Sequence, residues 1–534
     1  MAAAASGRAA VVERAEAVGG VSLRAWLLLA GISSAAVMDA INSTVLSIAR
    51  AQMMGSSHAT PDEIAWLNIA YFIAKLTMFP VAVWLLARMG RRRVLLGATS
   101  LLLASALGCA LTTDLGPLIA WRAAQGAGGA VLLVAGQTLL FELFPRRQQG
   151  MVQAAFALAI VMMPTTIAPA LQGWTTDALS WSWIFLFSLP FGAIGMPALL
   201  VHVDEPKRHA GRFDWPGAAL LGIAMACLVF VSQEGSRYDW FEEPKIVHLT
   251  IGGTVALALF VAWEIRAGQR AALIDFGVLR DAHFNFGFVV SFVAGCALFG
   301  SAFIIPAFAL SVIDLGPMHA GLLLLPGGVT LGLGLLAVGG LIQFGKVPPM
   351  LFIPAGILCF MAAMWMLSGL TVESGAPDMT LPLLLRGLGL SLLFIPLTMV
   401  TLADLGGRLL GHGVALFNLG RQVGGLIGIA GLATYLDHQA AQGRFVLAAY
   451  LAPGNPELAE RQDMIVAALV ARGFSPAEAA SAAMAVIRSA FQAQVNVLSF
   501  SEGFLALALL FVAAVPVLLS IKLAQTICAG HGRH

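Results

Sequence analysis

Five charged side chains lie within long apolar stretches of this sequence, where a charge is energetically expensive. They are one acid, Asp39, and four cations, Lys75, Arg122, Arg386 and Arg421. A charge deep in a bilayer is costly unless it faces water or a partner, so each of these residues is a candidate functional group. A single acid among cations can take up and release a proton as its surroundings change. The pattern indicates proton-linked chemistry centred on Asp39.

The depth of each charge within its stretch predicts which of them meet. At about 1.5 Å per helical residue, Asp39 and Arg122 lie near the same level of a hydrocarbon core about 30 Å thick. Lys75 lies roughly 10 Å deeper, so its long side chain reaches only part of the way. Two interpretations remain open: a titrating carboxylate, or a permanent ion pair that locks two helices. Arg386 has a further alternative, because it lies about seven residues from a span end and could snorkel to the surface. Arg421 lies near the middle of its span, so this alternative explains it less well.

The elements that must position these charges are membrane helices. The chain has 534 residues, of which 59% are hydrophobic and 11% charged, and its mean hydropathy is +0.87. Soluble proteins carry roughly 25% charged residues, so this much apolar surface must face lipid. Because the apolar runs are continuous rather than alternating, a membrane β-barrel is excluded. Fourteen runs are long enough to span a bilayer, approximately residues 24–48, 64–87, 94–112, 116–140, 150–174, 183–203, 215–233, 247–265, 285–311, 318–343, 349–370, 380–403, 411–434 and 502–523.

The net charge and the cysteine spacing limit the possible partners and cofactors of the protein. The chain has 30 Lys and Arg against 28 Asp and Glu, and its net charge of +2 gives no support to nucleic-acid binding. The cysteines are far apart and show no metal or redox spacing.

The basic residues predict the orientation in the membrane. They concentrate in every second loop, as at Arg91 and Arg146, and the positive-inside rule assigns these loops to the cytoplasm. Both termini are therefore predicted to be cytoplasmic.

The polar stretch before the last span is the exception among the short loops. It contains an N-cap signal at Asn455, a stop at Gly473 and a capping box from Ser475 to Glu478. These signals predict an external helical hairpin over about 450–495. Such a hairpin is either an inert cover or a docking surface for a partner.

Motifs of soluble enzymes do not occur. The run from Gly340 to Val347 approaches a phosphate-binding loop, but Val347 stands where that loop needs Ser or Thr. There is no HExxH motif, nucleophile elbow or CxxC pair, and the histidines are scattered among loops and span ends. A membrane-embedded enzyme or a sensor is therefore disfavoured against a secondary transporter.

Several motifs resemble those of one transporter family. The fourth span carries the run Arg122-Ala-Ala-Gln125-Gly126-Ala-Gly128-Gly129. Further marks are Pro80, Trp84, Gly90, Arg91, Arg92 and Arg93 around the end of the second span, and Arg386, Gly387 and Gly389 in the twelfth. On these residues the chain resembles the major facilitator superfamily, in its fourteen-helix drug:proton antiporter branch, and is similar to EmrB-like multidrug efflux pumps.

The resemblance implies an all-α integral membrane protein with the major facilitator fold and 14 transmembrane helices. Two six-helix bundles, in residues 1–203 and 285–534, would rock about a central cavity, with two inserted helices in residues 204–284. The expected substrate contacts in that cavity are Asn42, Gln137, Phe299, Phe303, Phe394, Arg386 and Arg421. For the aromatic residues, packing against lipid or the protein core is the alternative. The expected conformational residues are Gly90, Arg91, Pro169 and Gly173.

The sequence departs from the family pattern at informative places. Val83 and Ala87 replace the glycine and aspartate that are usual after the second span, so the ionic latch of that aspartate is missing. Asn42, rather than Asp39, falls on the family's acidic position, and the two are about one helical turn apart. In the fifth span Pro169 remains, and it should kink that helix.

These features predict a proton-coupled exporter (an antiporter) of hydrophobic or amphipathic small molecules, working in multidrug efflux by alternating access. Asp39, Arg122 and Lys75 would couple the proton. The alternative is a dedicated exporter of one endogenous metabolite, such as a siderophore or an antibiotic. No cofactor is expected besides the proton gradient. The expected location is a bacterial cytoplasmic (inner) membrane, and the expected partners are a periplasmic adaptor (membrane fusion protein) and an outer-membrane channel.

Overall fold

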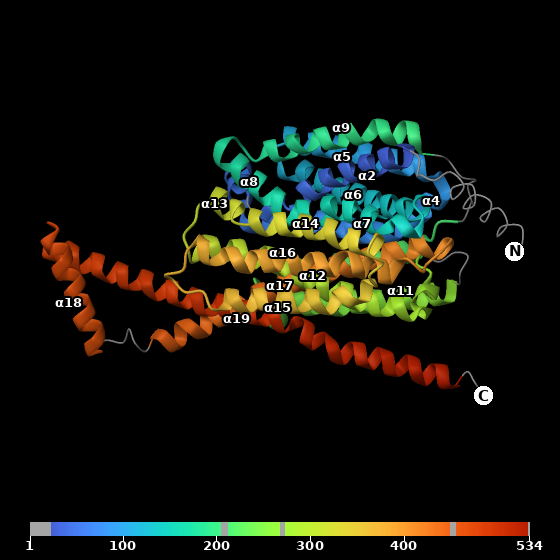
Figure 1. The fold of residues 1–534 in the computed structure, drawn as a ribbon. Coiled ribbons are helices and arrows are strands. Elements are labelled where there is room, and N and C mark those ends of the chain that lie inside the picture. Colours follow the sequence, from blue (N-terminus) through green and yellow to red (C-terminus); the bar gives the residue numbers. More distant parts are fainter. Residues whose placement is uncertain (1–22, 48, 204–211, 268–272, 449–454, 532–534) are drawn as a thin grey trace, which may run out of the picture.

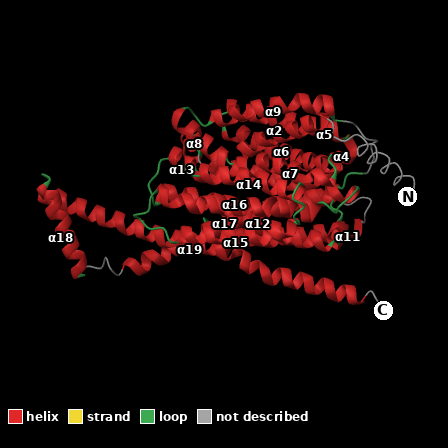
Figure 2. Ribbon diagram, viewed as in Figure 1, coloured by secondary structure: helices red, strands yellow, loops and turns green. Residues whose placement is uncertain are grey.

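The computed structural model describes residues 23–47, 49–203, 212–267, 273–448 and 455–531. Within these ranges all regular structure is helical, and no strand occurs (Figure 1, Figure 2). Fourteen helices are long and apolar enough to cross a bilayer, and each coincides with a predicted span. The predicted all-α membrane fold with 14 spans is therefore confirmed.

The spans follow one another with short connections. In chain order they are α2 (Leu23–Ser43), α4 (Pro61–Met89), α5 (Arg91–Leu111), α6 (Leu115–Leu143), the composite of α7 (Gln149–Ala157), η3 (Leu158–Ile167) and α8 (Ala168–Ala178), α9 (Ser182–His202), α10 (Trp215–Glu234), α11 (Pro244–Ala267), α12 (Ala282–Ser311), the pair α13 (Pro317–Leu322) and α14 (Leu325–Gln343), α15 (Phe352–Ser368), α16 (Ala376–Leu402), α17 (Arg408–Ala448) and α19 (Pro476–His531). The shorter elements are η1 (Val45–Ser47), α3 (Arg50–Ser57), η2 (Arg146–Gln148), η4 (Trp240–Glu242), η5 (Phe276–Arg280), η6 (Pro349–Leu351) and α18 (Pro456–Ala471).

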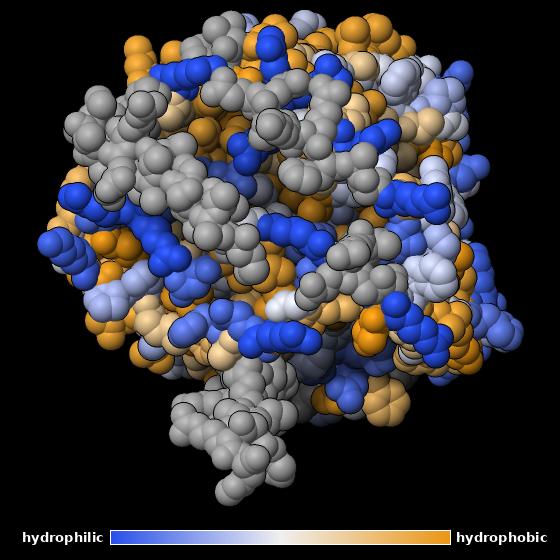
Figure 3. Space-filling model, turned by 90° about the vertical axis from the view of Figure 1, so that its right-hand side faces the viewer, coloured by the Kyte–Doolittle hydropathy of each residue, from blue (hydrophilic) through white to orange (hydrophobic). Residues whose placement is uncertain are grey.

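The spans lie side by side in one bundle, with hydrophilic side chains spread over the end face near the N-terminus (Figure 1, Figure 3). Along the sides of the bundle, large apolar side chains remain exposed, for example Leu259 and Ile265 of α11. This distribution suits a bundle whose flanks contact lipid and whose ends contact water. Helices α10 and α11 pack against each other, and α10 also contacts α4 and α17.

The predicted hairpin caps are present, but the hairpin is built differently from the prediction. Asn455 caps α18 by accepting a hydrogen bond from the Glu457 amide, and Ser475 and Glu478 form the expected capping box. The second arm is not a separate helix, because α19 runs from the hairpin through the last span as one helix of 56 residues. At 1.5 Å per residue it is about 84 Å long, far more than a bilayer needs. Helices α17 and α19 therefore project from the bundle and carry α18 at their end (Figure 1). Residues 450–454 of the predicted hairpin lie outside the described residues.

The turn between α4 and α5 depends on a glycine. Gly90 ends α4 and precedes α5 with a φ of 86°, a backbone conformation that side chains disfavour. The next residue, Arg91, forms an ion pair with Glu142 near the end of α6. Gly90 and Arg91, two of the predicted conformational residues, thus connect α4, α5 and α6.

The fifth and tenth spans touch along most of their length. A Cβ at Gly339 of α14 would lie 2.6 Å from the Gly150 carbonyl oxygen, and one at Gly321 would lie 2.9 Å from the Pro169 carbonyl oxygen. Between these points, a Cβ at Gly328 would collide with Thr166. The Thr166 side of this contact belongs to η3, a π-helical segment that holds Pro164. Predicted Gly173 is buried further along, in α8. We call α2 to α9 the first half of the protein and α12 to α19 the second half. These glycines let the two halves approach backbone to backbone.

We predict that Gly339→Val pushes α14 away from α7, because the new side chain would overlap the Gly150 backbone. Overpacking of this kind costs about 1–3 kcal/mol, so the thermal unfolding midpoint of the purified protein in detergent should fall. Gly340→Val is the matched control, because a Cβ there meets nothing closer than 4.0 Å. Equal midpoints for the two variants would contradict the close contact.

Candidate functional site

A buried ion pair joins α2 and α4. Lys75 Nζ lies 2.8 Å from Asp39 Oδ2, and the two side chains are 3% and 13% exposed. Tyr71, one helical turn before Lys75, donates its hydroxyl to Asp39 Oδ1 at 3.0 Å. Lys75 also donates to the Tyr71 hydroxyl oxygen at 2.6 Å. The Asp39 carboxylate thus accepts hydrogen bonds from two donors, one of which carries a positive charge.

Arg122 of α6 lies beside this pair but bonds elsewhere. Its Nη1 donates to the Asn42 carbonyl and to Gln125 Oε1, both at 2.8 Å. Its guanidinium carbon lies 4.4 Å from the centroid of the Tyr71 ring, a cation–π contact. Arg122 therefore ties the end of α2 to α6, while the Tyr71 ring connects it to the ion pair of Asp39.

The prediction that the Lys75 side chain reaches only part of the way to Asp39 was wrong, because the two side chains are in direct contact. The reason is the direction of the side chains: each leans toward the N-terminal end of its own helix. Since α2 and α4 are consecutive spans that run in opposite directions, the two side chains lean toward each other. Helix levels counted along the axis do not include this effect.

Two glycines of α6 make room for the network. A Cβ at Gly129 would collide with the Asp39 carboxylate, and a Cβ at Gly126 would collide with the Tyr71 carbonyl. Both belong to the motif run that begins at Arg122. The motif therefore supplies the cation and also the space in which the carboxylate lies.

Asn42 belongs to the same network. It is fully buried, and its side-chain amide donates to Ser188 Oγ of α9 at 3.2 Å. Its backbone carbonyl accepts the Arg122 bond described above. The structure thus places Asn42 one helical turn from Asp39, in contact with α6 and α9.

In the second half, Arg421 of α17 lies next to a polar bridge between the two halves. Asn418 donates to Gln137 Oε1 of α6 at 2.7 Å, and Arg421 Nη2 donates to Asn418 Oδ1 at 2.6 Å. The guanidinium carbon of Arg421 lies 5.2 Å from the Phe394 ring and 5.7 Å from the Phe417 ring. Three of the predicted cavity residues, Gln137, Phe394 and Arg421, are therefore brought together.

The other predicted cavity residues are spread along α12 and α16. Arg386 of α16 is buried and donates from Nε to Ser301 Oγ of α12 at 2.8 Å. Phe299 of α12 packs beside Gly425 of α17. Phe303, four residues further along α12, is 37% exposed.

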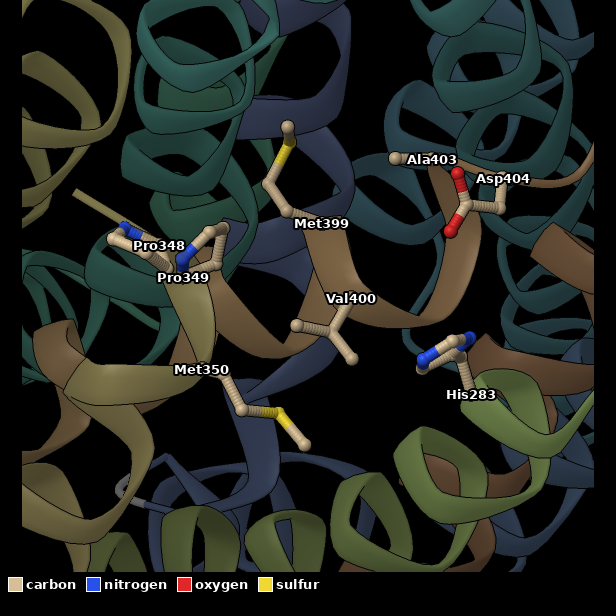
Figure 4. Close-up of a pocket in the computed structure, with 8 residues that line it drawn as sticks. All are labelled: His283, Pro348, Pro349, Met350, Met399, Val400, Ala403 and Asp404. Carbon is tan, nitrogen blue, oxygen red and sulfur yellow. The ribbon is translucent and has the colours of Figure 1, made fainter. Parts of the chain in front are cut away.

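A cavity of about 330 Å³ opens at one end of the second half (Figure 4). Its lining residues are His283, Pro348, Pro349, Met350, Met399, Val400, Ala403 and Asp404, so none of the predicted contacts lines it. Asp404, at its edge, forms an ion pair of 3.2 Å with Arg146 of η2. Both partners are largely exposed, so this pair adds little stability, but it connects the two halves beside the cavity.

Polar bonds between the halves are found toward both ends of the bundle. At the end near Arg146, the Met151 amide of α7 donates to Gln343 Oε1 of α14 at 3.1 Å. At the other end, Asp177 Oδ2 of α8 accepts from the Met318 amide of α13 at 3.3 Å. The halves are thus in contact on both sides of the level at which Asp39 and Arg421 lie buried.

The sequence analysis did not predict Tyr71, Gln125 or Asn418 as site residues, although it quoted Gln125 as part of a motif. These three residues complete the two networks. None of the three carries a charge, so the search for buried charges passed over them. Tyr71 had one available signal, its spacing of four residues before Lys75 on the same helix. Asn418 had a similar one, three residues before Arg421.

We predict that Asp39 and Lys75 are energetically coupled. Removing one member of a buried pair costs about 3–5 kcal/mol, because the other charge loses its compensation. Asp39→Asn and Lys75→Met should each lower the thermal unfolding midpoint, and the double variant should lose less than the sum of the two. The control pairs Asp39→Asn with Arg444→Gln, an exposed site on α17, where the effects should add. Additivity for Asp39 and Lys75 as well would contradict the coupling.

Comparisons with known proteins agree with this architecture. The sequence profile of the Major Facilitator Superfamily matches residues 32–429. The chain is 27% identical over 439 residues to the multidrug export protein EmrB of Haemophilus influenzae, covering 80% of this chain and 84% of that protein. It is 23% identical over 496 residues to the fatty acid resistance protein FarB of Neisseria gonorrhoeae, covering 92% of this chain and 95% of that protein.

Solved structures show the same fold. The human organic anion transporter MFSD10 superposes with a TM-score of 0.54 at 15% identity, covering 91% of this chain and 99% of that one. The proton:xylose symporter XylE superposes with a TM-score of 0.52 at 14% identity, covering 81% and 92%. At these identities the likeness establishes the fold alone. The profile covers well over half of the chain, and its members are transporters rather than enzymes. This multi-pass membrane protein therefore belongs to the Major Facilitator Superfamily.

Proposed function

We propose that this protein is a proton-coupled exporter of hydrophobic or amphipathic small molecules. The observation that carries the proposal is the Asp39 carboxylate, held inside a span by Lys75 and Tyr71. A buried carboxylate with a single cationic partner is the kind of group whose protonation changes helix contacts. The names of the relatives, a multidrug export protein and a fatty acid resistance protein, support an exporter of such molecules.

The proposed coupling step is the loss of the Asp39–Lys75 ion pair. Protonation of Asp39 removes the negative charge that holds Lys75, and the neutral acid keeps only ordinary hydrogen bonds. The α2–α4 contact then weakens, next to the point where Arg122 binds the end of α2. Because this point adjoins α6, which reaches the second half through Gln137, a change there can bias the contact between the halves. The protein alternates between states open to either side, driven by the proton gradient without a cofactor.

The proposed orientation puts both termini in the cytoplasm of a bacterium and the α17–α18–α19 projection outside the inner membrane. The basic side chains of every second loop support it. The projection carries exposed apolar side chains, with Phe445 85% and Met464 63% exposed. Apolar groups that face water suit a surface that binds a protein. We infer that the projection docks a periplasmic adaptor (membrane fusion protein), which leads to an outer-membrane channel.

We predict that Asp39→Asn abolishes gradient-driven transport. Proteoliposomes containing the intact protein should export a fluorescent hydrophobic dye when a pH gradient is imposed, because proton uptake at Asp39 drives the cycle. The Asn variant is fixed in a neutral form and should lose this drive. It should still exchange dye between the two sides without a gradient, because exchange needs no net proton transfer.

The matched control for this experiment is Asp114→Asn, which makes the same chemical change at an exposed residue before α6. It should transport as the intact protein does. Undiminished gradient-driven transport by Asp39→Asn would move the coupling role to another group. Absence of transport by the intact protein would count against export of hydrophobic dyes.

We predict that a cysteine at Ser475 reacts from outside the cell. In a variant without natural cysteines, a membrane-impermeant maleimide crosslinker should label Ser475→Cys in intact cells and should then trap a co-expressed adaptor. Arg147→Cys, at an exposed position of η2 at the opposite end of the bundle, should be labelled only after the membrane is permeabilised. Labelling of Arg147→Cys in intact cells would reverse the orientation. Labelling of Ser475→Cys without an adaptor crosslink would argue against docking.

A further inference from the structure

Arg386 and Arg421 are buried cations in the second half that lack a carboxylate partner. They are 2% and 5% exposed, and in the part of the chain that the structure describes neither takes part in an ion pair. In the first half Asp39 balances Lys75 directly, while Arg122 donates to the Asn42 carbonyl and to Gln125 Oε1. An uncompensated charge inside a membrane protein is costly, so two of them call for an explanation.

The two arginines have donors to spare. A guanidinium carries five N–H groups in a planar fork. Arg386 uses Nε for Ser301, while its Nη2 is buried without a partner. Arg421 donates through Nη2 to Asn418. An oxyanion such as a carboxylate or a sulfonate accepts two such bonds at once, and its charge compensates the cation.

The surroundings of Arg421 also suit the apolar part of a ligand. The Phe394 and Phe417 rings lie within 5.2 and 5.7 Å of its guanidinium carbon. Aromatic walls bind apolar ring systems, and a small inorganic anion would gain nothing from them. The chemistry around Arg421 thus combines a cation, an amide and aromatic surface.

Arg421 lies where a separation of the halves would expose it. Its partner Asn418 donates to Gln137 of the first half at 2.7 Å. If the halves move apart, this bond breaks, and Asn418, Gln137 and Arg421 face the opened space together. Arg386 lies eight residues from Phe394 on α16, about 12 Å along the helix axis. The positive charge therefore continues from the middle of the bundle toward the Ala376 end of α16.

We propose that Arg421 forms an anion-binding subsite, with Arg386 as a second anion-binding residue along the path, and that the exported substrates are amphipathic organic anions. This inference rests on the proposed export function and specifies its substrate class. Asn418 and Gln137 hold the subsite closed in this conformation. The substrate's carboxylate or sulfonate supplies the negative charge that neither arginine has beside it in the described part of the chain, and its apolar body lies against the Phe394 and Phe417 rings.

The test uses two probes of matched size and fixed, opposite charge: 1-naphthalenesulfonate and 1-methylquinolinium. Binding is measured by equilibrium dialysis against the full-length protein in phosphatidylcholine nanodiscs, which contain no anionic lipid. The intact protein should bind the sulfonate at least about tenfold more tightly than the cation, since a hydrogen bond to a charged group is worth more than a tenfold change in affinity. Arg421→Gln should remove this preference, and Arg386→Gln should reduce it.

Two further variants make the test specific. Arg444→Gln removes the same charge from an exposed position of the same helix, α17, and should bind as the intact protein does. Arg421→Lys keeps the charge but loses the planar fork, so its affinity should be intermediate. If Arg421→Gln does not fold, Arg421→Lys and Arg386→Gln still decide the matter. Equal binding of the two probes, or unchanged sulfonate binding in these variants, would overturn the proposal.

Counterflow separates this proposal from the proposed function. Proteoliposomes loaded with unlabelled sulfonate should accumulate labelled sulfonate without any pH gradient. If counterflow occurs but a pH gradient drives no export, proton coupling is wrong and the anion subsite stands. If a gradient drives export of the cation while the sulfonate neither binds nor exchanges, the export function stands and the anion subsite is wrong.

Discussion

A charged side chain inside the hydrocarbon core has no bulk water to solvate it, and this constraint governs the interior of the protein. The Asp39–Lys75 pair meets it by direct contact, and Tyr71 supplies a further donor. Arg122 meets it with the backbone carbonyl of Asn42 and the amide oxygen of Gln125. These contacts use α2, α4 and α6 together, so the three helices can move relative to one another only by breaking bonds that are costly to leave unmade.

The same constraint is met differently in the two halves. In the first half a carboxylate balances a lysine, and a proton can upset this balance. Among the described residues of the second half, the partners of Arg386 and Arg421 are a hydroxyl, an amide and aromatic rings. Under the two proposals above, the proton binds on one side of the central interface, at Asp39, and an anionic substrate binds on the other, at Arg421. The Asn418–Gln137 bond connects the two sides.

Movement between the halves depends on how they touch. The contact of α13 and α14 with α7, η3 and α8 includes glycines: Gly339 brings two backbones close, and Gly328 leaves room for the Thr166 side chain. On the facing side, the π-helical segment from Leu158 to Ile167 interrupts the regular hydrogen bonding of the fifth span. Glycine contacts beside an irregular helix are suited to rocking, and the polar bonds described near each end are partly exposed.

The sequence by itself determined the fold class, the fourteen spans and the identity of the buried charges. Each of these follows from local composition: a run of apolar residues must form a helix in lipid, and a charge within it is visible without knowing its neighbours. The hairpin caps at Asn455 and Ser475 were likewise readable, because capping depends on residues three or four apart.

Only the tertiary structure decided which charges pair. Lys75, not Arg122, contacts Asp39, because side chains on antiparallel helices lean toward each other in a way that axial counting ignores. The sequence did not predict that Tyr71 and Asn418 belong to the networks, because an uncharged polar residue can be recognised as part of a site only when its partner is known. That no carboxylate of the described residues pairs with Arg386 or Arg421 is likewise a property of packing, since it depends on what four separate helices bring together.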